Sequence, residues 1–275
     1  MKTKLNFYQG SKVGIPTLIQ NLILGGIFAF TVNSTVMGST GTDFPGDNPP
    51  SKIISGSVEG SNNLGDGPDL QKSDTAKWRQ LFNGKDLTGW KHVGPGSMSV
   101  ENGLIRGHGG MGLLYWTGEK FGDCVLRVVF KMELTNSNSG VFIRIPIEPF
   151  EEWMPVYYGY EVQIDNQPEL SDEDDYHYTG MLYSLTKPLA KPGKPGPEWN
   201  TMEITMDGLK TSVVVNGVKV MEYKEGDPVP DRKFDFEPFR GPRPETGYIG
   251  LQNHGDKDVV FFKEVAVKSL KKSQK

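Results

Sequence analysis

From Trp78 onward the chain is a succession of short apolar or alternating runs separated by turn residues, and this pattern most limits its fold. The runs at 113–116, 140–145 and 211–215 are rich in residues that suit a pleated, half-buried surface. After residue 75 no run of about eleven residues or more keeps a clean helical period, so the crossover helices of a parallel sheet are missing. The sequence therefore predicts an all-β fold, a two-sheet antiparallel sandwich.

The turns between the runs support this prediction. Asn102-Gly103 and Asn216-Gly217 stand between apolar runs, which is the strongest short-range signal for a β-hairpin, and Asp207-Gly208 repeats it. The chain's 34 glycines and 19 prolines also suit a protein built from short strands and many turns.

The N-terminal segment 1–38 has the layout of a targeting sequence. Its first twelve residues carry three lysines and no acid, and a dense apolar stretch follows at 22–30. This order is typical of a secretory signal, with cleavage expected after Gly38. The alternative is an uncleaved membrane anchor, although Pro16 and the polar residues at 20–21 weaken its first half. We expect the protein to be exported to the periplasm or the extracellular space, with membrane contact only through this segment.

Residues 39–76 contain few large apolar side chains and many Gly, Ser, Asp, Asn and Pro, which predicts a flexible linker. The folded domain is then expected over 77–270, followed by a short tail at 271–275. The single cysteine, Cys124, excludes a disulfide framework within one chain, and its apolar surroundings favour a buried core residue. A formal net charge of −4 argues against nucleic acid as a partner.

Several motifs follow one another in order along this domain. They are Leu81-Phe-Asn-Gly-Lys-Asp-Leu-Thr-Gly-Trp90, Asn136-Ser-Asn-Ser-Gly-Val-Phe-Ile-Arg144, Gly159-Tyr-Glu-Val-Gln-Ile-Asp165, Thr179-Gly-Met-Leu-Tyr183, Glu198-Trp-Asn200, Gly247-Tyr-Ile-Gly-Leu-Gln-Asn-His-Gly255 and Val260-Phe-Phe-Lys-Glu-Val-Ala-Val-Lys268. Together they closely resemble the 3-keto-disaccharide hydrolase domain family. The resemblance implies a concanavalin A-like jelly roll, export in bacteria and action on a sugar oxidised at C3. Such a ketone acidifies the C2 proton, so the glycosidic bond breaks by elimination followed by addition of water.

Strand alternation suggests where a sugar would bind. Side chains at i, i+2 and i+4 share one face of a strand, so Glu161, Gln163 and Asp165 lie opposite the apolar Val162 and Ile164. This polar face is either the floor of a sugar cleft or an ordinary solvated surface, and the family resemblance favours the cleft.

The two carboxylates are too far apart for the usual glycosidase mechanism. At about 3.3 Å per residue, the Cβ atoms of Glu161 and Asp165 are about 13 Å apart. Retaining and inverting glycosidases hold their carboxyls at about 5.5 Å and about 6.5–9.5 Å. The spacing favours a single base that removes the C2 proton, with another group stabilising the enolate.

Other polar residues are candidates for supporting roles. Alternation places Arg144 away from the core, where it would stabilise an enolate or form an ion pair with Glu161, and places Gln252 and His254 on the corresponding face of a later strand. His254 is an acid/base candidate or a solvated turn residue. Asn138 and Ser139, at the head of the strand that holds Arg144, are expected at the cleft rim.

Three further candidate residues belong to loops. Trp153 is the preferred stacking platform because it lies outside the strands, and Tyr183 is a second aromatic candidate. The family resemblance implies that His177, just before the Thr179–Tyr183 motif, reaches the cleft. No cofactor or metal site is expected; the acidic run 172–175 could bind Ca²⁺ but lacks ordered ligand spacing.

We therefore expect an exported enzyme that cleaves 3-keto-glycosides, with Glu161, Asp165, Arg144 and His254 as the catalytic candidates. The alternative is a carbohydrate-binding module without activity, and the ionisable residues on the polar face favour the enzyme. A plain glucanase is disfavoured by the carboxylate spacing.

Overall fold

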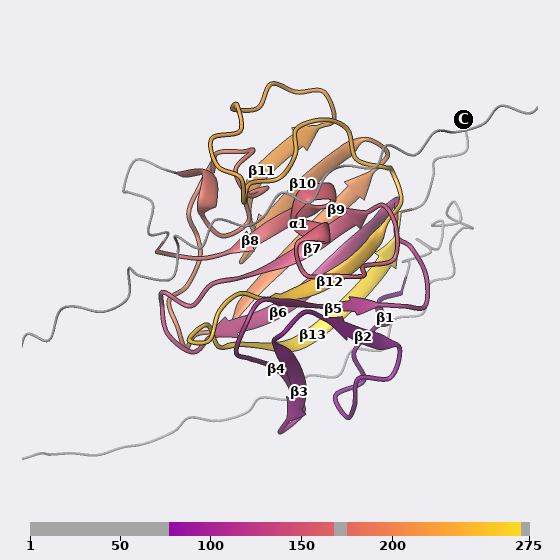
Figure 1. Ribbon diagram of the computed structural model, residues 1–275, viewed down its shortest axis with the longest axis vertical. Coiled ribbons are helices and arrows are strands. Elements are labelled where there is room, and N and C mark those ends of the chain that lie inside the picture. Colours follow the sequence, from indigo (N-terminus) through magenta and orange to yellow (C-terminus); the bar gives the residue numbers. More distant parts are fainter. Residues whose placement is uncertain (1–76, 168–174, 271–275) are drawn as a thin grey trace, which may run out of the picture. The chain divides into compact units, whose positions relative to one another are not determined.

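The computed structural model describes residues 77–167 and 175–270 (Figure 1). The predicted signal or anchor (1–38), linker (39–76) and tail (271–275) lie outside the described residues, as does most of the acidic run 172–175. No helix in the described part of the chain has the length and apolar character to cross a bilayer.

The described residues form two antiparallel sheets, and the larger sheet has eight strands. Its order is β11-β10-β9-β6-β13-β4-β3, and β1 pairs with β13 beside this path. Its strands are β1 (Arg79–Gln80), β3 (Ser97–Glu101), β4 (Leu104–His108), β6 (Cys124–Met132), β9 (Asn200–Asp207), β10 (Lys210–Val215), β11 (Val218–Lys224) and β13 (Val260–Ser269).

The smaller sheet has five strands in the order β2-β5-β12-β7-β8. Its strands are β2 (Trp90–Val93), β5 (Gly112–Trp116), β7 (Ser139–Ile145), β8 (Tyr160–Ile164) and β12 (Tyr248–Asn253). The helix α1 (Met154–Tyr158) and the 3₁₀ turn η1 (Asp175–His177) complete the described elements. The predicted all-β, two-sheet antiparallel sandwich is confirmed.

The core between the sheets follows directly from strand alternation. Along β6 every second residue is buried, from Cys124 to Met132. Val162 and Ile164 of β8 contribute to the same core from the smaller sheet. The hairpin turns also behave as predicted, because Asn102 and Asn216 adopt φ of 52° and 50°, the left-handed region that Asn-Gly turns require.

A second apolar cluster covers part of the outer face of the smaller sheet. Met154 and Val156 of α1 pack there on Tyr115, Phe142 and Ile145. Figure 1 shows α1 in front of this sheet. The sequence did not predict this short helix. By packing on the outer face of the smaller sheet, it forms one wall of the cavity described below.

Candidate active site

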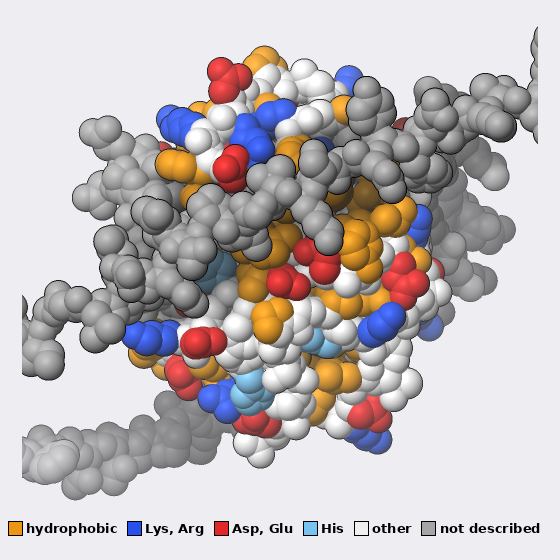
Figure 2. Space-filling view, in the orientation of Figure 1, with side chains coloured by type: hydrophobic (Ala, Val, Ile, Leu, Met, Phe, Trp, Pro, Cys, Tyr) orange, Lys and Arg blue, Asp and Glu red, His pale blue; other side chains and the backbone are white. Residues whose placement is uncertain are grey.

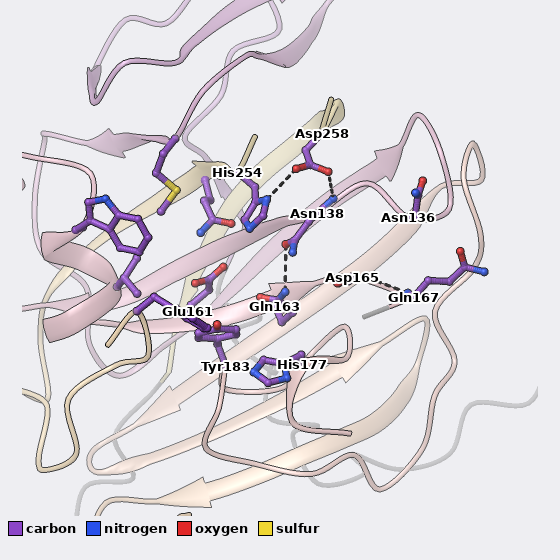
Figure 3. A pocket seen from close by; sticks show the side chains of 15 residues that line it. Asn136, Asn138, Glu161, Gln163, Asp165, Gln167, His177, Tyr183, His254 and Asp258 are labelled. Carbon is purple, nitrogen blue, oxygen red and sulfur yellow. Dashed lines mark hydrogen bonds and ion pairs between the residues drawn. The ribbon is translucent and has the colours of Figure 1, made fainter. Parts of the chain in front are cut away.

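A cavity of about 360 Å³ opens over the outer face of the smaller sheet (Figure 3). A cavity of this size is within the range of small-molecule sites. Its walls are formed by Met111, Asn136, Asn138, Trp153, Val156, Glu161, Gln163, Asp165, Gln167, His177, Tyr183, Phe236, Gln252, His254 and Asp258.

The edge strand β8 supplies the centre of this cavity. Val162 and Ile164 enter the core, so Glu161 and Gln163 face the opposite way, and both line the cavity. Asp165 follows the last residue of β8 and also lines the cavity, while its carboxylate accepts the backbone N–H of Gln167 at 2.8 Å. The three polar residues therefore share one face, as alternation predicts.

Glu161 is buried, with 7% of its surface exposed. Burial disfavours the charged carboxylate and raises its pKa to about 8; the charge of His254 and a hydrogen bond from Gln252 offset only part of this effect. Gly140, on the neighbouring strand β7, makes room for this side chain, because a Cβ there would lie 2.3 Å from Glu161 Oε1. The site thus holds a carboxyl group that titrates near neutral pH.

His254 lies on the same cavity wall and is paired with Asp258. The distance from His254 Nδ1 to Asp258 Oδ2 is 2.8 Å. Burial alone would lower the pKa of His254, but this hydrogen bond and the negative charges of Asp258, Glu161 and Asp165 outweigh burial and raise it. Burial acts against ionisation of Asp258, yet His254 and the backbone N–H of Asn138 together lower the pKa of this carboxyl. The pair therefore favours a protonated imidazole facing the cavity.

Amide side chains also contribute to the polar wall, and three of them carry interactions that bear on ligand binding. Gln163 Nε2 donates to Asn138 Oδ1 at 3.1 Å, and Gln252 donates to Glu161. The carbonyl oxygens of Gln163 and Gln252 are buried and have no hydrogen-bond partner among the described residues. A buried acceptor without a donor is costly, so both oxygens favour a ligand that carries hydroxyl groups.

The segment 177–185 runs along the edge of β8 that faces away from β7 and brings two more residues to the cavity. Its backbone pairs with β8, with Tyr183 N donating to Glu161 O at 2.9 Å. The rings of Tyr183 and His177 are 4.8 Å apart, and His177 Nε2 lies 3.1 Å from Ser184 Oγ. Tyr183 and His177 are therefore brought to the cavity, where the sequence placed them.

Comparison with protein-family models gives a match over residues 77–268, to the 3-keto-alpha-glucoside-1,2-lyase-like domain. The chain belongs to this family. The sequence resemblance, and the concanavalin A-like sandwich that it implied, are thereby confirmed.

Solved structures agree with this placement. Two crystal structures, each described as a "putative glycosyl hydrolase" from Parabacteroides distasonis, are 26% identical over 70% of this chain. They cover 94% and 100% of those chains, with TM-scores of 0.58 and 0.56. A Bacillus subtilis protein with a galectin-like fold has a TM-score of 0.50 and 14% identity over 71% of this chain and 96% of its own, which supports the fold alone. Comparison with curated proteins finds no match.

Arg144 of this lyase-like domain lies away from the cavity, contrary to the sequence prediction. Tyr248 pairs with Ile145 and Gly250 with Phe142, so β7 holds one extra residue at this point, a β-bulge, and Arg144 there has φ of 54°. Alternation is broken at the bulge.

The guanidinium of Arg144 instead ties two loops to the sheet. It donates to Thr211 Oγ1 and to the backbone carbonyls of Gly208, Lys210, Pro244 and Glu245, at 2.8–3.3 Å. With only 2% of its surface exposed, this side chain holds the fold together and does not reach a substrate.

Ser139 also differs from its predicted place at the rim. It is 1% exposed, does not line the cavity, and its hydroxyl donates to the backbone carbonyl of Gln252 at 2.8 Å. It therefore joins β7 to β12 beneath the site, whereas its neighbour Asn138 does line the cavity.

Sequence reasoning missed Asp258 and Phe236, among other lining residues. Asp258 stands four residues after His254 in a turn rich in Gly and Asp, and that spacing was the available signal. Phe236 belongs to the run Phe234-Asp-Phe-Glu-Pro-Phe239. The concentration of aromatic residues in this polar, proline-containing loop was the signal that could have identified it.

No group of three or more His, Cys, Asp and Glu side chains within 77–167 and 175–270 is arranged to hold a metal ion. Asp175, the described end of the acidic run, forms an ion pair with Lys191 at 2.5 Å.

Proposed function

We propose that this domain cleaves the glycosidic bond of 3-keto-glycosides by removing the C2 proton, with Glu161 as the base. The observation that carries the proposal is the buried Glu161 carboxyl, whose pKa is raised to about 8, in a cavity that also holds the His254–Asp258 pair. A carboxylate with a raised pKa is a stronger base than an exposed one.

The reaction follows from the roles of these groups. Glu161 takes the proton from C2, and the electron pair forms an enolate with the C3 ketone. When the enolate collapses, C1=C2 forms, the C1–O bond breaks and the departing oxygen takes a proton from His254. Neutral His254 then takes a proton from water as the hydroxide adds at C1, and Glu161 returns its proton to C2. Both side chains are restored, and the net result is hydrolysis.

Stabilisation of the enolate requires hydrogen-bond donors other than Arg144. The Asn138 amide and the Tyr183 hydroxyl belong to the cavity wall and are the candidates for this role. Gln163 Oε1 and Gln252 Oε1 would accept hydrogen bonds from sugar hydroxyls.

The test compares a 3-keto-disaccharide with its unoxidised parent, using the purified full chain. We expect sugar release from the oxidised compound only, and loss of turnover in Glu161→Gln with binding retained. The control is Glu203→Gln, a half-buried carboxyl of β9 on the larger sheet. Equal turnover of both compounds would refute the keto-specific mechanism, and binding without turnover by the wild type would favour a carbohydrate-binding module.

We also propose that the protein is exported through its N-terminal segment, on the strength of its lysine-rich start and the apolar stretch at 22–30. The test is N-terminal sequencing of the protein recovered from a bacterial periplasm. A mature N-terminus just after Gly38 would support a cleaved signal, whereas an intact start in the membrane fraction would identify an anchor.

A further inference from the structure

Aromatic side chains are unevenly distributed over the described surface. Every exposed large aromatic residue in 77–167 and 175–270 comes from two segments, 150–158 and 234–239. The six are Phe150, Trp153, Tyr158, Phe234, Phe236 and Phe239. Figure 2 shows hydrophobic side chains (orange) gathered on the face where α1 lies in Figure 1. Single exposed apolar residues are ordinary, but a concentration of this kind marks a binding surface.

This aromatic surface is continuous with the cavity. Trp153 and Phe236 both line the cavity and keep 37% and 41% of their surface exposed. From Trp153 a row of nearly parallel rings continues through Tyr157, at 6.0 Å, to Phe239, at a further 5.1 Å. Phe236 stacks on Phe234 at 5.0 Å and an interplanar angle of 7°.

The two segments are fastened together by buried polar groups. Arg243, 7% exposed, donates to the carbonyls of Tyr157, Gly159 and Phe239 at 2.7–3.1 Å, and Phe239 N donates to Tyr157 O at 3.2 Å. These four hydrogen bonds set the position of Phe239 against α1.

The loop that carries Phe236 is held in a similar way by its neighbour Glu237, which is 3% exposed. The Glu237 carboxylate accepts from Lys233 N and Arg240 Nη2, each at 3.0 Å, and its backbone carbonyl accepts from Arg232 Nε. Rigid aromatic groups bind with little loss of conformational entropy. The rings beside the cavity are thus fixed before any ligand arrives.

We propose that Trp153 and Phe236 form a subsite for the leaving group of the glycoside, which stacks a ring with a flat apolar face on these side chains. This inference rests on the proposed function, in which the polar residues around Glu161 hold the oxidised sugar. Trp153 and Phe236, the aromatic rim of the cavity, then hold the leaving group. The ring is that of an aromatic aglycone or of a second sugar, both of which present such a face. An acyclic leaving group gains nothing from the rim.

The test measures kcat/KM for three 3-keto-glucosides, with methyl, phenyl and glucosyl leaving groups, in the wild type and in Phe236→Ala. We expect the phenyl-to-methyl or glucosyl-to-methyl ratio to fall about two- to tenfold in the variant, the range for loss of one aromatic contact. Comparing ratios between proteins cancels the intrinsic reactivity of each leaving group. Phe236→Leu, which keeps apolar volume without a ring, repeats the measurement in case the alanine variant fails to fold.

The control is Phe261→Ala, which removes a half-buried aromatic residue of β13. Phe261 lies in the larger sheet, away from the cavity, and contacts Lys131 and Arg106 of the same sheet. A fall confined to the phenyl compound identifies an aromatic aglycone, and one confined to the glucosyl compound a second sugar. Ratios equal to the wild type in both Phe236 variants would overturn the subsite while leaving the proposed function intact. If the wild type cleaves none of the three, the proposed function fails and the subsite fails with it.

Discussion

Replacing Glu161 by Gln should make the protein more stable at alkaline pH, although the same change removes the proposed base. The pKa of this carboxyl is 4.5 when it is unperturbed and about 8 in the folded protein. Between these values the folded state holds a proton that the unfolded state has lost, so the free energy of unfolding falls as pH rises. At 1.36 kcal/mol for each pH unit, the free energy of unfolding falls by about 3–4 kcal/mol between pH 5 and pH 8.

Denaturant unfolding of the wild type and Glu161→Gln at pH 5, 6.5 and 8 measures this effect. Gln is nearly isosteric and carries no charge, so the stability of the variant relative to wild type should rise between pH 5 and pH 8 by about 3–4 kcal/mol, or roughly 6–16 °C in Tm. Titrating groups that do not interact with Glu161 act equally in both proteins and cancel in the difference, whereas His254, whose pKa the charge of Glu161 helps to raise, adds a contribution of its own. The same measurement on Glu203→Gln, at a half-buried carboxyl in the other sheet, is the control. If the difference between wild type and Glu161→Gln is the same at all three pH values, Glu161 does not carry a raised pKa and the reasoning fails.

Three further changes test other parts of the site. Arg144→Met should lower the free energy of unfolding by about 3–5 kcal/mol, since it leaves buried carbonyl groups unpaired; thermal unfolding checks this, and kcat/KM of the folded protein should stay at the wild-type value. Gly140→Ala places a methyl group within 2.3 Å of Glu161 Oε1 and should lower turnover about tenfold or more without unfolding the domain, as kinetics and circular dichroism would show. Asp258→Asn removes the carboxylate that raises the pKa of His254, so the alkaline limb of the rate profile should move to lower pH; an unmoved limb would exclude His254 as the acid.

The fold could be predicted from the sequence because its signals are local. Alternation in β6 and β9 and the Asn-Gly turns each act over a few residues, and the structure uses them as expected. The helix α1 was missed because it is only five residues long, too short for a 3.6-residue period to be visible. Lys263 interrupts the apolar pattern near the C-terminus, yet Val260–Ser269 forms one strand, β13, with a bulge at that residue.

The site was predicted where alternation holds and missed where loops meet. Glu161 and Gln163 follow from the period of β8, and Gln252 follows from that of β12. Phe236 could not be placed, because nothing local says that a loop 70 or more residues after α1 in the chain is fastened to it by Arg243. The pairing of His254 with Asp258 likewise depends on the path of a turn.

The bulge at Arg144 explains both the largest error and part of the site's construction. Without the extra residue in β7, Ile145 would point into the core beside Ile143, as alternation predicts. With it, Ile145 turns to the outer face, where it packs against Met154 and Val156 of α1. That packing fixes the helix whose N-terminal neighbour, Trp153, forms the cavity wall. The extra residue in β7, Arg144, thus lies outside the site but helps to position Trp153. Deletion of Arg144 removes the bulge, whereas Arg144→Met keeps it, so only the deletion should displace α1 and weaken binding of ring-bearing leaving groups. The ratios of kcat/KM among the three 3-keto-glucosides would detect this loss.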